Sequence, residues 1–355
     1  MSQSIDEDLV IKDIDSPLYK YFFFYRIDIK NCFVSDRQKL VQKIKSNILW
    51  IHFFVCIIRY GVLSIIFKKR ISVYYLDLFQ YFGEFPEFYY IIVIFGSFLC
   101  FRILHIFNHS NSNDYEWLNI IKVLNGSQSF DSLKIYNKNE IQKYVQKIKT
   151  FKFFLNLCIY STLTLALFTS LTILFVFFNY SDLIRFGILS AFIYLINCYF
   201  WFSIIGFSYL YYFIVCFFCK TIFKSFNNSR KLLFDGKGKA FLKYKTIDQL
   251  IEDHNSICLD IKLYNKFWQK YYFSLTYTLI PMNLILLQLM LFEDQIFPLF
   301  FVCLLPFLVT IGSHLMFNLM TASINSEASK SYKSLLEMYL KTNSLLNTKR
   351  KMKVI

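Results

Sequence analysis

Long apolar runs separated by polar segments dominate the chain. Six of them have the ~20 mainly apolar residues that a helix needs to cross the ~30 Å hydrocarbon core of a bilayer. The pattern therefore predicts an all-α fold, a polytopic membrane helix bundle preceded by the segment 1–47 and followed by the segment 322–355. Within residues 48–321, the predicted spans are 48–67, 88–107, 153–178, 186–219, 271–292 and 296–321.

Three of these runs have features that a simple span lacks. The fourth, residues 186–219, is too long for one crossing, so its helix either continues beyond the membrane surface or breaks near Gly206. Only residues 293–295 separate the last two runs, which predicts a tight hairpin. Pro281 and Pro306 lie inside those two runs and predict kinks.

Two further segments have helical periodicity outside the spans. Apolar residues recur mostly at three- and four-residue steps over 246–263 and over 322–346, a spacing typical of amphipathic helices. The first leads into the fifth span, and the second follows the sixth. We expect their apolar faces to pack on each other or on a partner subunit. The basic residues 349–351 and Lys353 predict contact with the inner leaflet.

The distribution of charge predicts the orientation. The chain has 39 Lys and Arg against 24 Asp and Glu, a formal net charge of +15. If residues 1–47 lie inside, 33 of the 39 basic residues fall on the inner side, in agreement with the positive-inside rule. Residues 1–47 begin with acidic side chains and do not have the pattern of a signal peptide. Both termini are therefore predicted to be cytoplasmic.

A nucleic-acid surface is the other explanation for this positive charge. However, the basic residues are divided among four predicted inner segments, and no nucleic-acid-binding motif accompanies them. The chain is also 56% apolar, which suits a lipid environment better than a soluble surface. We therefore predict the lipid bilayer, and no nucleic acid, as a partner.

Motifs that would indicate catalysis or metal binding do not occur in the sequence. There is no nucleophile elbow, phosphate-binding loop or zinc-protease motif. Cys216 and Cys219 form an isolated pair, and His105 and His109 lack a third ligand nearby. The predicted spans contain no Asp or Glu, which argues against a proton-coupled transporter. The sequence predicts no enzyme activity, no metal and no cofactor.

Two arginines are the charged residues within the predicted spans. Arg102 lies near the inner end of the second span and can extend its guanidinium to the interface. Arg59 lies deeper, towards the predicted outer side of the first span. We expect it to pair with Asp77, Glu84 or Glu87 from the segment that follows, because an unpaired charge is costly there.

The predicted outer half of the bundle offers candidates for a ligand pocket. By depth, Phe192 and Tyr194 of the fourth span are the aromatic candidates. Asn197 and Gln288 are polar positions that either line a pocket or hydrogen-bond to another helix. The fourth span also has an aromatic stripe that packing alone would explain: Tyr194, Tyr199, Phe200, Trp201, Tyr209, Tyr211 and Tyr212.

Two local motifs, together with this architecture, resemble a known family. The stretch IEDHNSICLDIKLYNKFW contains Asn265 close to Phe267 and leads into the fifth span. The stretch SINSEASKSYKSLLEMY follows the sixth span and contains Glu327 and Ala328. These stretches, and more weakly residues 16–29, resemble the arthropod gustatory/odorant receptor superfamily of ligand-gated cation channels.

The resemblance implies a seven-transmembrane chemoreceptor subunit in the plasma membrane. It implies sensory perception of a small-molecule ligand and assembly as a homo- or hetero-oligomer, a tetramer in this family. Members have a seventh span that lines the ion pore, whereas no apolar run follows Met338 here. We therefore expect the chain to lack that last helix. The alternative is a six-span transporter or a structural membrane protein without ligand gating.

The predicted orientation can be tested by glycosylation. Asn179 begins the acceptor motif predicted to lie outside, whereas those at Asn108, Asn125 and Asn227 are predicted inside. In a glycosylating cell line, we expect a glycosidase-sensitive mass shift that Asn179→Gln abolishes. A glycan on any of the other three asparagines would contradict the orientation.

Overall fold

The computed structural model describes residues 36–65, 86–109, 117–124, 138–177, 187–234, 247–292 and 297–352. Within these ranges the chain forms α-helices and no strand, so the prediction of an all-α fold is confirmed. The helices are α1 (Asp36–Ile65), α3 (Pro86–His109), α4 (Leu118–Leu124), α5 (Lys138–Phe177), α7 (Ile188–Phe234), α8 (Ile247–Phe292) and α9 (Phe297–Met352).

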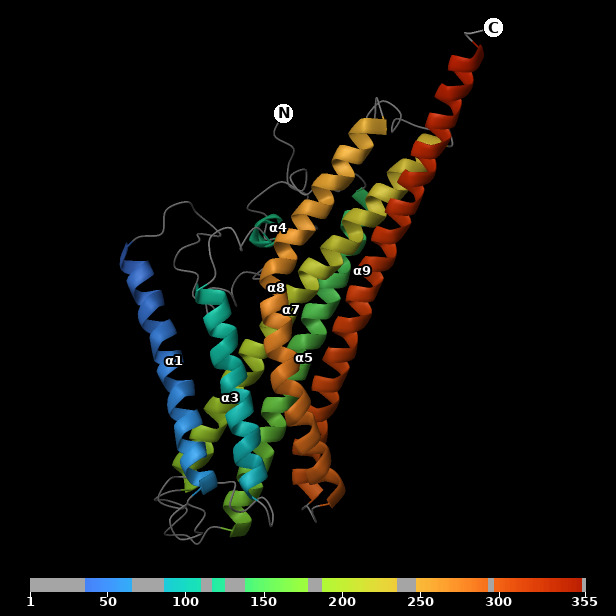
Figure 1. The fold of residues 1–355 in the computed structure, drawn as a ribbon. Coiled ribbons are helices and arrows are strands. Elements are labelled where there is room, and N and C mark those ends of the chain that lie inside the picture. The colour runs from blue at the N-terminus through green and yellow to red at the C-terminus, as the bar shows by residue number, and fades with distance from the viewer. Residues whose placement is uncertain are drawn as a thin grey trace.

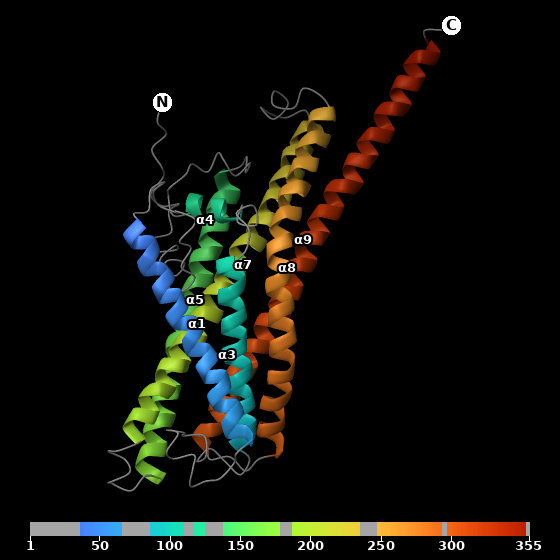
Figure 2. The same ribbon diagram turned by 60° about the vertical axis from the view of Figure 1, so that its left-hand side comes forward.

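All these helices except α4 form an elongated bundle (Figures 1 and 2). Each of the six is long and apolar enough to cross a membrane. The first residues of α1 and the last residues of α9 lie at the same end of the bundle (Figure 1). At this end α7, α8 and α9 extend well past α3, and α9 extends furthest. Helix α4 is short and lies near the same end.

The longest helices resolve the alternatives that the sequence left open. Helix α7 has 47 residues and passes Gly206 without a break, so at 1.5 Å per residue it is about 70 Å long and must extend beyond a bilayer core. Helix α8 joins the expected amphipathic segment and the fifth span in one helix of 46 residues. Helix α9 does the same for the sixth span and residues 322–346.

Two helical segments lie outside the helices that the sequence predicts. Helix α5 begins at Lys138, well before the predicted third span, 153–178. Its buried Ile141, Tyr144, Val145 and Ile148 follow the i, i+3, i+4, i+7 pattern that marks an amphipathic helix. Helix α4 was also missed, and its seven residues are too few to give a periodic signal.

Helix α7 lies at the centre of the packing. In the most apolar part of α7, 78% of the residues are buried inside the bundle. The corresponding share is 22–33% in α8, α9, α5 and α1. At its middle, Tyr212 contacts the rings of Trp268 and Phe317 at centroid distances of 5.3 and 4.6 Å. Phe107 of α3 meets Phe267 of α8 edge-on at 5.2 Å. Aromatic edges therefore join α3, α7, α8 and α9 in one core.

Gly206 sets the distance between α5 and α7. A Cβ placed there would lie 3.1 Å from Ile159 and 3.2 Å from Leu155, both on α5. We expect Gly206→Leu to overpack this contact and lower the free energy of unfolding in detergent by about 1–3 kcal/mol. Gly61→Leu is the matched control, since nothing lies within 4 Å of a Cβ at Gly61. Equal melting temperatures for the two variants would contradict this account.

Candidate functional site

A cavity of about 140 Å³ lies among five helices of the bundle. Helix α7 contributes Tyr194, Cys198 and Trp201 to its wall. Across the cavity, α3, α5, α8 and α9 provide mainly aliphatic side chains. The remaining lining residues are Tyr89, Ile92, Val93, Gly96, Leu99, Thr162, Leu165, Ala166, Phe202, Ile205, Tyr209, Leu279, Met282, Leu286, Cys303, Pro306, Val309 and Thr310.

The wall of the cavity is almost entirely apolar. The hydroxyl of Thr162 donates to the carbonyl of Cys158 at 2.7 Å, and that of Thr310 donates to the carbonyl of Pro306 at 2.7 Å. The hydroxyl of Thr310 also contacts Oδ1 of Asn283 on α8. Both hydroxyls therefore already have partners within the bundle. Apolar cavities of about 150 Å³ stay free of water and bind molecules such as benzene. The site thus suits a small uncharged molecule held by contact area and shape.

Gly96 and Trp201 determine the shape of one side of the cavity. A Cβ at Gly96 would lie 3.1–3.2 Å from three atoms of the Trp201 ring. An aromatic ring cannot yield as the end of an aliphatic chain can, so any side chain at this position must displace the indole. Glycine therefore allows the indole of Trp201 to pack directly on the backbone of α3 beside the cavity.

The structure separates the four predicted pocket residues. Tyr194 lines the cavity, whereas Phe192 is 59% exposed on the outer surface of α7, and Gln288 of α8 is also exposed. Asn197 is buried against α1, where its Oδ1 lies 2.7 Å from Nε2 of His52. Phe192 and Tyr194 were predicted by depth, and successive helical residues point about 100° apart, so similar depth did not imply the same face. For Asn197, the structure shows the other role that the sequence left open, a hydrogen bond to another helix.

The two intramembrane arginines take different environments. The guanidinium of Arg59 lies over the ring of Tyr60, 5.1 Å from its centroid. Of its expected partners, Asp77 and Glu84 lie outside the described residues, so the pairing stays a prediction. Arg102 is partly exposed on α3, as an interface residue would be.

The four residues of the family-like motifs lie on α8 and α9, and they differ in how far they are buried. Phe267 is fully buried, with its ring centroid 5.3 Å from that of Trp117. Asn265 is exposed. Ala328 is partly buried and packs against the core of the bundle. Glu327 makes polar contacts with Asn227 of α7 and with Lys330 of α9.

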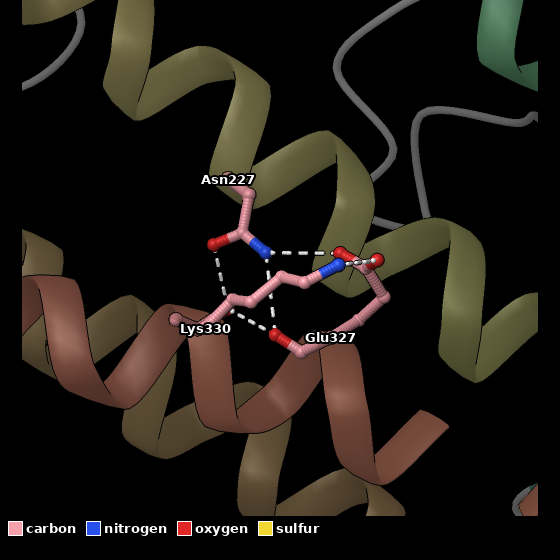
Figure 3. A network of polar contacts seen from close by, with 4 residues as sticks. Asn227, Glu327 and Lys330 are labelled. Carbon is pink, nitrogen blue, oxygen red and sulfur yellow. Dashed lines mark hydrogen bonds and ion pairs between the residues drawn. The ribbon is translucent and has the colours of Figure 1, made fainter. Parts of the chain in front are cut away.

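Glu327 belongs to a polar cluster that joins α7 to α9 (Figure 3). The Nδ2 of Asn227 donates to the carbonyl and to Oε2 of Glu327, at 3.3 and 3.4 Å. The hydroxyl of Ser331 donates to Oδ1 of Asn227 at 2.7 Å. Lys330 lies 2.8 Å from Oε1 of Glu327. The cluster thus fixes the crossing of the two helices at their extended ends.

Comparison with known proteins identifies the architecture. No protein-family model matches the sequence, and no curated protein matches it either. The solved structure of the insect olfactory receptor OR5 from Machilis hrabei is similar to this chain, with a TM-score of 0.64 at 12% sequence identity. The similarity covers 92% of this chain and 81% of that chain. The chain has the fold of an insect olfactory receptor.

The olfactory-receptor fold accounts for the long helices and for the resemblance found in the sequence. The residues that matter most in the cavity were nevertheless not selected from the sequence. Trp201 and Tyr209 belong to the aromatic stripe that packing alone would explain, and Gly96 and Cys303 were not among the predicted pocket residues. A glycine within an apolar span is a weak signal of a close helix approach, because Gly96 and Gly206 lie against another helix whereas Gly61 and Gly312 have nothing within 4 Å.

The polar cluster at Asn227 generates a stability prediction. Replacing this buried asparagine by alanine removes both bonds to Glu327 and the bond from the hydroxyl of Ser331. We expect Asn227→Ala to lower the free energy of unfolding by about 1–3 kcal/mol, measured by thermal unfolding in detergent. Asn325→Ala, at an exposed position on α9, is the control. A loss of stability no larger than that of the control would contradict a stabilising role for the polar cluster.

Proposed function

We propose that this chain is a subunit of a chemoreceptor-like, ligand-gated cation channel that senses a small apolar molecule. The observation that carries the proposal is a nearly wholly apolar cavity among five helices of an olfactory-receptor fold. A molecule held there contacts α3, α5, α7, α8 and α9 at once. Its binding free energy can therefore act on the relative positions of these helices, as gating by differential affinity requires.

The same cavity supports a specific class of ligand. Its volume of about 140 Å³ suits molecules of benzene size and somewhat larger, given that the wall can adapt. Charged or strongly polar molecules would lose their hydration without gaining partners. The proposed ligands are therefore neutral, mainly hydrocarbon compounds. No part of this function requires bond-breaking chemistry, so the chain is proposed to be a receptor and not an enzyme.

Apolar side chains on the extended helices support assembly into an oligomer. Leu259 of α8, and Tyr332 and Leu336 of α9, are 62%, 64% and 45% exposed. They lie beyond the length of helix that a bilayer core covers, where exposed apolar area favours association. We propose that the chain assembles through these faces in the plasma membrane, as a tetramer by the family resemblance.

The alternative is a six-span transporter or a structural membrane protein without ligand gating. Patch-clamp recording from cells that express the chain discriminates between these functions. The chain is expressed alone and as a fusion that continues after Ile355 with the last helix of an olfactory receptor, and surface delivery is confirmed for each. A cation current evoked by small apolar volatiles in either form supports the proposal. Silence of both forms at the surface favours the alternative.

A substitution at Gly96, in the wall of the cavity, tests most directly whether the cavity binds the ligand. A Cβ at Gly96 lies too close to the Trp201 ring, so we expect Gly96→Ala to shift this ring and change the shape of the cavity. One methyl group in an apolar pocket changes affinity by ~10–200-fold. We expect the half-maximal concentration for the largest effective ligand to rise by about tenfold or more, with smaller ligands less affected.

Two controls accompany this variant. Gly312→Ala adds the same methyl group where nothing lies within 4 Å, and Phe192→Ala removes a side chain that faces outward. Both should leave the concentration–response curve unchanged. A curve altered by the controls and not by Gly96→Ala would exclude the cavity as the binding site.

A further inference from the structure

The first turns of α5 are basic, and they lie at the same end of the bundle as the start of α1 (Figure 2). Lysines recur in these turns, at Lys143, Lys147, Lys149 and Lys152. Directly after them, Phe153 and Phe154 are 65% and 56% exposed. Because α5 is apolar enough to cross a membrane, these two side chains mark the level at which the helix meets lipid.

A single acidic residue lies within this basic segment. Glu140 is the sole Asp or Glu of α5, and its side chain is only 10% exposed. Its Oε2 lies 3.2 Å from Nζ of Lys224 on α7, and its Oε1 lies 4.0 Å from Nζ of Lys143. The two lysine side chains are 45% and 65% exposed. Since they share one carboxylate, a net positive charge remains at this surface.

A third lysine lies along the same line of contact between α5 and α7. The Nζ of Lys147 is 5.7 Å from the centroid of the Phe217 ring on α7. Lys143 and Lys147 are one turn apart on α5, and Phe217 and Lys224 are two turns apart on α7. We call Lys143, Lys147 and Lys224 the α5–α7 lysine row. Its contacts with Glu140 and Phe217 hold three positive charges along one boundary between the helices.

The lysine row continues into the lipid-facing surface of α5. Phe154 follows Lys143 by eleven residues, about three turns, so the two side chains share one face of the helix. At 1.5 Å per residue, Lys147 and Lys143 lie about 10 and 16 Å beyond Phe154 along the helix. The polar headgroup layer is only ~5–8 Å deep on each side of a bilayer. The row therefore lies at and beyond the outer edge of that layer.

These distances select the kind of lipid. The single phosphate of an ordinary phospholipid stays within the headgroup layer, whereas an inositol ring with further phosphates extends beyond it. Basic clusters next to the cytoplasmic end of a span are typical of binding to such anionic lipids, and lysine binds phosphate as a point charge. We propose that the α5–α7 lysine row binds the headgroup of a phosphoinositide whose acyl chains lie along Phe154.

A lipid fits this surface better than another acidic partner does. A nucleic acid or an acidic protein would have no use for the exposed Phe154, which lies on the same face as the lysine row. The extended part of α8 also has exposed lysines, but acidic residues lie among them, so its charge is mixed. The proposal does not depend on ligand gating, because lipid binding can be measured on the purified chain.

Lipid binding is measured on the full chain, purified in a neutral detergent. Short-chain phosphatidylinositol bisphosphate is added in increasing amounts, and bound lipid is counted by native mass spectrometry. We expect it to bind about tenfold or more tightly than phosphatidylserine with the same acyl chains, which has fewer negative charges. Inositol trisphosphate has the phosphates without the acyl chains, so it should compete only at concentrations about tenfold higher or more.

A pair of double variants locates the site. Lys143→Gln with Lys147→Gln removes two charges from the lysine row and keeps Lys224 beside Glu140. Each basic residue near the membrane surface contributes about fivefold to the binding of anionic lipid, so affinity should fall by about 25-fold. Lys262→Gln with Lys266→Gln removes two exposed charges from α8. This control should change affinity by about twofold at most, because distant exposed charges are screened.

A second pair adds charge and removes no contact. Thr150 is exposed on α5 between Lys147 and Phe154, on the face of the lysine row. Thr150→Lys should therefore strengthen phosphoinositide binding about fivefold. Gln269→Lys adds the same charge at an exposed position on α8 and should leave the affinity unchanged. Helical circular dichroism and gel filtration in detergent show whether each variant is folded.

Three results would overturn the proposal. The first is phosphatidylserine that binds as tightly as the phosphoinositide, and the second is an equal loss of affinity in the α5 and α8 double variants. The third is inositol trisphosphate that competes at the concentration of the lipid, which would indicate a site for a soluble anion. If the α5 double variant does not fold, the comparison of Thr150→Lys with Gln269→Lys decides the outcome.

Discussion

The burial of α7 is the constraint on which the rest of this structure depends. Lipid offers no hydrophobic drive to bring helices together, so packing and polar contacts must do so. Helix α7 meets this requirement with aromatic side chains that contact neighbours on nearly every side, as between Tyr212, Trp268 and Phe317. Gly206 lets α5 approach the same helix closely. The surrounding helices can then leave their other faces to lipid, as the exposed side chains of α1, α8 and α9 show.

Polar pairs along α7 set its register against three neighbours. Asn197 meets His52 of α1, and Ser208 lies 2.7 Å from the hydroxyl of Tyr271 of α8. Tyr212 and Thr321 of α9 are 3.2 Å apart, and Asn227 contacts Glu327 further along α9. Each pair satisfies a group that would otherwise be costly in an apolar environment. Together they specify how the neighbouring helices are placed along α7, which aromatic contacts alone leave adjustable.

The cavity is a consequence of the same packing. Large aromatic side chains fill the middle of the bundle, whereas Gly96, Ala166 and aliphatic residues leave space on the side of α7 that faces α3 and α5. The space is bounded on one side by Trp201, whose ring is fixed by the backbone at Gly96.

The sequence by itself determined the class of protein: six apolar runs, the charge asymmetry and the helical periodicity before the fifth span depend only on local composition and spacing. It did not predict the helix over residues 138–152, although their apolar residues are spaced as on an amphipathic helix. Only the tertiary structure decided that Tyr194 faces the cavity, that Phe192 and Gln288 face outward and that Asn197 turns to His52. The reason is physical: a span's sequence fixes how deep a residue lies, whereas the face it presents depends on which helices surround it.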